Sequence, residues 1–116
     1  MGGMERVHNV LKRFANDTGF DQSKFKDLVE DTNPDTAIAI LKEFNKTLGA
    51  TIETLNAEPS DKDGVGKACH KVAGSAALVG FLGIESLARA NKRGDQEITG
   101  LVARLKAAHQ ALTEIL

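Results

Sequence analysis

The chain has 116 residues, enough for one domain around a single hydrophobic core and too few for two, so we expect residues 1–116 to form one domain. Its 15 basic and 16 acidic residues give a formal net charge of −1, which lacks the positive excess of nucleic-acid-binding proteins. One cysteine excludes an intramolecular disulfide and gives no metal-ligand spacing. The chain has no apolar run of about 18 residues and no signal peptide, so we expect it to be cytoplasmic, with no membrane association.

The N-terminal part of the chain predicts two short helices. Apolar residues recur at helical spacing over residues 4–15, and the Asp-Thr-Gly sequence of residues 17–19 ends this segment. A second segment over residues 21–30 carries Phe25, Leu28 and Val29 on one face. We expect both segments to pack across one end or side of the main fold.

Residues 34–56 predict one long helix. Asn33 followed by Pro34 is a strong helix start, because a capping side chain precedes a proline at the first helical position. Gly49 lies inside this helix, where it allows a bend or a close contact. The apolar stripe of the helix comprises Ile38, Leu41, Phe44, Leu48, Ile52 and Leu55.

Three more helices follow a polar loop over residues 57–64, in which Ser60 or Asp61 is placed to cap the next helix. We expect these helices to span residues 61–79, 82–93 and 95–115, the first of them ending near Gly80. Aromatic residues make up 4% of the chain, and strand-like alternation is absent. The sequence therefore predicts an all-α fold, an antiparallel four-helix bundle with one or two short additional N-terminal helices.

His70 lies in the middle of the helix predicted for residues 61–79. At about 100° per residue, one side of that helix gathers an apolar stripe, and His70 projects almost opposite to it. Two glycines inside one helix cost roughly 0.8–1 kcal/mol each relative to alanine, so we expect this surface to need room for another molecule. Small residues are expected on the His70 side and lysines along one flank: Gly66, Ala73, Gly74 and Ala77, and then Lys67 and Lys71.

This arrangement suits a site that handles phosphate. Histidine changes its charge near neutral pH, and a neutral imidazole has a nitrogen lone pair that can attack a phosphoryl group. Lys67 and Lys71 are expected within a turn of His70, where they favour the neutral imidazole and offset phosphoryl charge. The pattern alone does not identify the reaction, because a lone histidine on a solvent-facing side is usually only a solvated polar residue.

Residues 70–80, HKVAGSAALVG, resemble the signature of histidine-containing phosphotransfer (HPt) domains. In that family a glycine follows the histidine by four residues, then a small residue, and another glycine follows about five residues later, as Gly74, Ser75 and Gly80 do here. Apolar Ile84 and Leu87 continue the pattern into the next helix. The resemblance is specific over residues 68–88 and only general elsewhere. It implies a four-helix bundle with the histidine exposed in mid-helix.

The resemblance also implies a phosphocarrier that works in a two-component phosphorelay. His70 would accept a phosphoryl group from a response-regulator receiver domain or a sensor histidine kinase and pass it to a receiver aspartate. The receiver would bring Mg²⁺, so we expect this chain to need no cofactor or metal of its own. We also expect the chain to act as a monomer. The expected docking surface comprises Gly66, Ala73, Gly74, Ser75 and Ala77.

One position departs from the family pattern. Ala73 stands where HPt domains commonly have lysine, so Lys67 or Lys71 is expected to supply that charge. The departure favours an alternative function, a helical adaptor that docks a receiver or kinase domain without being phosphorylated. A hydrolytic enzyme with His70 as base lacks a carboxylate or nucleophile placed to assist it. His8 and His109 have no partner at metal-binding spacing, and we expect structural or solvated roles for both.

Overall fold

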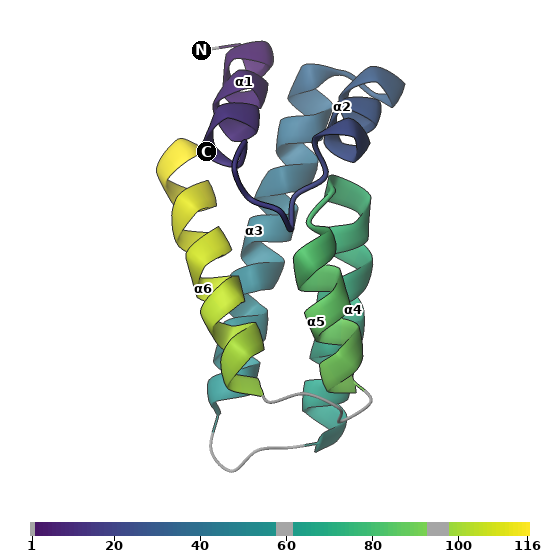
Figure 1. Ribbon diagram of the computed structural model, residues 1–116, viewed down its shortest axis with the longest axis vertical. Coiled ribbons are helices and arrows are strands. Elements are labelled where there is room, and N and C mark those ends of the chain that lie inside the picture. Colours follow the sequence, from purple (N-terminus) through teal and green to yellow (C-terminus); the bar gives the residue numbers. More distant parts are fainter. Residues whose placement is uncertain (1, 58–61, 93–97) are drawn as a thin grey trace.

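The computed structural model describes residues 2–57, 62–92 and 98–116, and these residues form six α-helices and no strand (Figure 1). The prediction of an all-α helical bundle is therefore confirmed. Each predicted helical segment is present, and its described ends lie within a few residues of the prediction. The helices are α1 (Gly3–Arg13), α2 (Gln22–Asp31), α3 (Pro34–Asn56), α4 (Lys62–Val79), α5 (Leu82–Lys92) and α6 (Ile98–Ile115).

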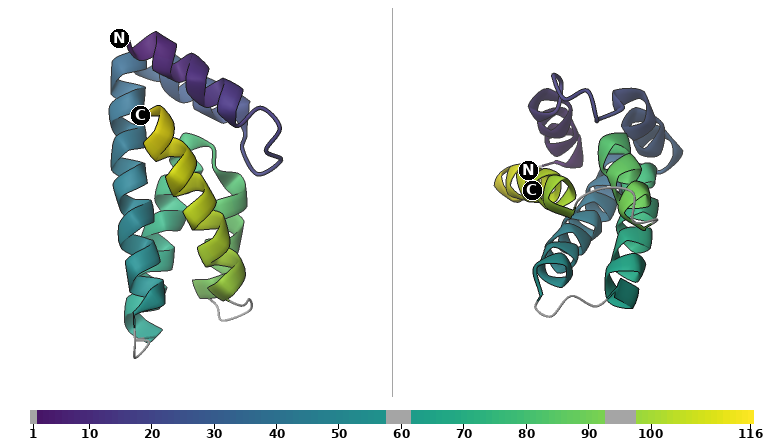
Figure 2. Two further views of the ribbon diagram at one scale, coloured as in Figure 1. Left: turned by 90° about the vertical axis from the view of Figure 1, so that its left-hand side faces the viewer. Right: turned by 60° about the horizontal axis from the view of Figure 1, so that its bottom comes forward.

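The four C-terminal helices form an antiparallel bundle. Each one runs opposite to its predecessor in the chain, and each packs against two others in the cyclic order α3, α4, α5, α6 (Figure 1). The two short N-terminal helices cover one end of this bundle, α1 against α3 and α6, and α2 against α3 and α4 (Figure 2). The molecule is elongated, with extents of 43 × 23 × 22 Å.

The core is aliphatic along the bundle and aromatic at the end covered by α1 and α2. Fully buried leucines from α3 and α6, such as Leu41 and Leu105, fill the space between the helices. All five phenylalanines of the chain join one cluster around Phe81, whose ring centroid lies 4.9 Å from those of Phe14 and Phe20 and 5.2 Å from that of Phe44. This cluster attaches the two short helices to the bundle.

Side-chain caps and one glycine turn set several helix boundaries. Asn33 caps α3, because its side-chain oxygen accepts the Thr36 N–H at 2.8 Å, and Pro34 follows as predicted. Gly80 ends α4 with φ at 91°, a conformation that glycine adopts without strain. The Asp21 N–H donates to the Gly80 carbonyl at 2.8 Å, which joins the start of α2 to this turn.

The predicted caps Ser60 and Asp61 and the predicted helix boundaries at residues 93 and 95 lie outside the described residues. In the parts of the chain that the structure describes, no helix has both the length and the apolar character needed to cross a membrane.

Candidate functional site

His70 lies more than two turns from either end of α4, and its side chain is exposed. The opposite face of the helix carries Val72, Ala76 and Val79, all of which are fully buried. The core therefore takes one side of α4 and leaves the imidazole facing outward. The prediction of an exposed histidine in mid-helix is confirmed.

Ala73 lies in the core and not on the His70 surface, so its prediction as a docking residue is wrong. Its exposed fraction is 0%, and Cys69, one turn earlier, is equally buried. The reason is that α4 packs against α3 and α5 along its length and against α2 as well, so its buried face is wider than the single stripe predicted. Since Ser75 and Leu78 line the gap to α3, the side with Ala73 faces α5.

Lys67 and Lys71 are both exposed, and they lie on the α3 side of His70. Around the helix axis, Lys67 and Lys71 are offset from His70 by about 60° and 100°, both in the direction that leads to Ser75 and the gap to α3. No carboxylate of the described residues lies within ion-pair distance of either lysine. Both ammonium charges are therefore available to an anionic group that approaches His70.

The fold requires glycine at only some of the glycine positions in and after α4. A Cβ atom on Gly66 or Gly74 would meet no heavy atom within 4 Å, so packing within the described chain does not demand glycine at either position. These two residues lie one helical turn before and one turn after His70. At Gly80, by contrast, a Cβ would lie 2.7 Å from the Asp21 carbonyl oxygen, and the fold itself needs the glycine.

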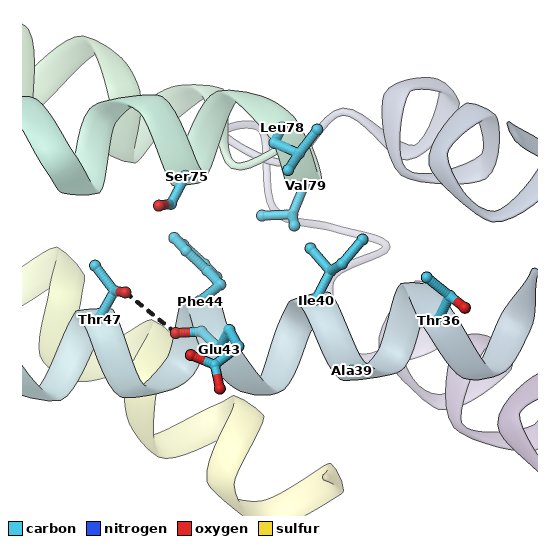
Figure 3. Close-up of a pocket in the computed structure, with 9 residues that line it drawn as sticks. All are labelled: Thr36, Ala39, Ile40, Glu43, Phe44, Thr47, Ser75, Leu78 and Val79. Atoms are coloured by element: carbon cyan, nitrogen blue, oxygen red, sulfur yellow. Dashed lines mark hydrogen bonds between the residues drawn. The ribbon is translucent and has the colours of Figure 1, made fainter. Parts of the chain in front are cut away.

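Ser75 and Ala77 are half-buried and border the exposed surface. Ser75 points from α4 toward α3, into a groove of about 330 Å³ between the two helices (Figure 3). Ile40 and Phe44 point into the same gap from α3 (Figure 3). The groove is lined by Thr36, Ala39, Ile40, Glu43, Phe44, Thr47, Ser75, Leu78 and Val79.

Leu78 is a surface residue that the sequence analysis missed. Its exposed fraction is 52%, and Leu78 and Met4 are the exposed large hydrophobic side chains of the described residues. Leu78 follows His70 by about 12 Å along α4, on the α3 side. A signal was present in the sequence, because a helical projection places this leucine off the buried stripe of α4.

Among the described residues, Cys69 and His109 have structural surroundings, and His8 has none. Cys69 is fully buried and behaves as a small hydrophobic side chain, and this burial raises the pKa of its thiol. The Nδ1 atom of His109 lies 2.8 Å from Asn45 Oδ1, and a Cβ at Gly49 would lie 3.3 Å from the His109 ring, which confirms the close contact predicted there. His8 is exposed. Within the described residues, no three His, Cys, Asp or Glu side chains are grouped so as to hold a metal ion.

The candidate site thus combines an exposed imidazole, two ammonium groups without a carboxylate partner among the described residues, and two glycines that packing does not require. An apolar groove and an exposed leucine continue the same face of the molecule. No protein-family model, curated protein or solved structure matches this chain.

Proposed function

We propose that this chain is a histidine phosphotransfer protein of a two-component phosphorelay, with His70 as its phosphoacceptor. His70 accepts a phosphoryl group from a receiver phospho-aspartate or from a histidine kinase and passes it to a receiver aspartate. The resemblance of residues 68–88 to HPt domains supports this proposal, and the all-α bundle agrees with the fold that the resemblance implies.

The observation that carries the proposal is the pair of glycines beside an exposed histidine. Gly66 and Gly74 each destabilise α4 by roughly 0.8–1 kcal/mol relative to alanine, and packing within the described chain gives no reason for them. A partner that brings a phosphorus atom within bonding distance of the imidazole needs a surface without bulk on both sides of it. Glycines one turn before and after His70 provide that surface.

The imidazole acts as a nucleophile in this reaction. A ring nitrogen of His70 attacks the phosphorus of the phospho-aspartate, so a P–N bond forms while the P–O bond to the carboxylate breaks and the carboxylate leaves. Lys67 and Lys71 offset the charge on the phosphoryl group from the α3 side. The receiver domain would supply Mg²⁺, which would bind phosphoryl oxygens and offset their charge. The reverse reaction on a second receiver restores the histidine, so the chain is a carrier and does not catalyse turnover alone.

Transfer from phosphorylated receiver domains tests the proposal. A panel of receivers that carry labelled phosphate is mixed with the wild type and with His70→Gln. We expect at least one receiver to transfer label to the wild type, in the acid-labile form typical of a P–N bond, and no label on His70→Gln. Absence of label on the wild type from every receiver would contradict the proposal.

A glycine variant tests whether the open surface matters. Gly74→Gln places a long side chain beside His70, and its Cβ atom would meet no heavy atom within 4 Å, so we expect it to slow transfer at least about tenfold while the fold is retained. Gly100→Gln is the matched control, because Gly100 in α6 also has no neighbour within 4 Å of a Cβ and lies on another helix. Equal transfer rates for the two variants would show that phosphoryl transfer does not need the open surface at Gly74.

A helical adaptor that docks a receiver or kinase domain without phosphorylation is the second candidate. The burial of Ala73 favours it, because the position where HPt domains commonly carry lysine faces the core here. The adaptor predicts that a receiver binds the wild type and His70→Gln equally well in calorimetry and that neither protein acquires label.

A further inference from the structure

We draw no further inference here: the strongest candidate, the side-chain cluster of Asn45, His109 and Thr113 between α3 and α6, makes its hydrogen bonds within the fold, and nothing in the described residues shows a ligand or a partner that it would bind.

Discussion

At the scale of single residues, the glycines around His70 divide into those that the fold requires and those that it does not. Gly80 has positive φ and lies against the Asp21 carbonyl, so its place in the motif has a structural cause. Gly74 has neither property, although the sequence pattern presents the two glycines as equals. Sequence alone could identify the motif but not this difference, because it depends on the distance to residues far away in the chain.

The difference predicts opposite effects of alanine on stability. Gly74→Ala should stabilise the protein by about 0.4–1 kcal/mol, because alanine reduces the entropy of the unfolded chain and its methyl group meets no atom of the described chain. Gly80→Ala should destabilise it by more than about 1 kcal/mol, because the methyl group clashes at a positive φ. Urea unfolding of both variants measures this, and a loss of stability in Gly74→Ala would show an unrecognised contact.

Cys69 predicts a dependence of stability on alkaline pH. Burial raises the pKa of its thiol in the folded state, whereas in the unfolded chain the thiol has a pKa of about 8.5. At a pH above that value, the unfolded chain therefore binds fewer protons than the folded chain. The free energy of unfolding should therefore fall as pH rises from 8 toward 10, and less so in Cys69→Ala, which removes the thiol. Urea unfolding at a series of pH values gives the comparison; parallel curves for the two proteins would be inconsistent with a buried thiol.

At the scale of helices, the sequence predicted the start of α3 correctly but not the width of the buried face of α4. Asn33 and Pro34 predicted the start of α3 at the correct residue, because capping is a local interaction between neighbours in the chain. The prediction for Ala73 was wrong because α4 contacts three helices, α2, α3 and α5, and a helical projection cannot tell how many neighbours a helix has. A row of small residues at Cys69, Ala73 and Ala76 was the available signal for the contact with α5.

The cap of α3 has a measurable effect on stability. Asn33→Ala removes the side-chain acceptor of the Thr36 N–H and should destabilise the protein by about 1 kcal/mol. Asn33→Asp keeps an acceptor and places a negative charge at the helix N-terminus, so it should retain wild-type stability. Thermal unfolding by circular dichroism compares the two; equal melting temperatures for alanine and aspartate would exclude the cap as a source of stability.

At the scale of the whole molecule, the phenylalanine cluster joins the two short helices to one end of the bundle. The sequence predicted both short helices but not how they attach, because the cluster joins Phe14 directly after α1 to residues of α2, α3 and the connecting segments. The four-helix arrangement itself followed from amphipathic stripes and short connections, which leave few ways to bury the apolar faces.

Phe81 is the residue on which this attachment depends most. Phe81→Ala removes a ring that is 2% exposed and contacts three other phenylalanines, so it should destabilise the protein by about 3–5 kcal/mol. Phe81→Leu keeps most of the volume and should cost clearly less. Guanidinium unfolding monitored by circular dichroism measures both; a small loss in the alanine variant would mean that the cluster does not hold the two short helices in place.

The most direct test of the account is the chemical state of His70 after contact with phosphorylated receiver domains. Intact-mass spectrometry at neutral pH, followed by peptide sequencing, should find one added phosphoryl group on the wild type, located at His70 and lost on brief acid treatment. His70→Gln should remain unmodified under the same conditions. A wild-type protein that gains no phosphoryl group from any receiver, or gains it equally in His70→Gln, would contradict the account.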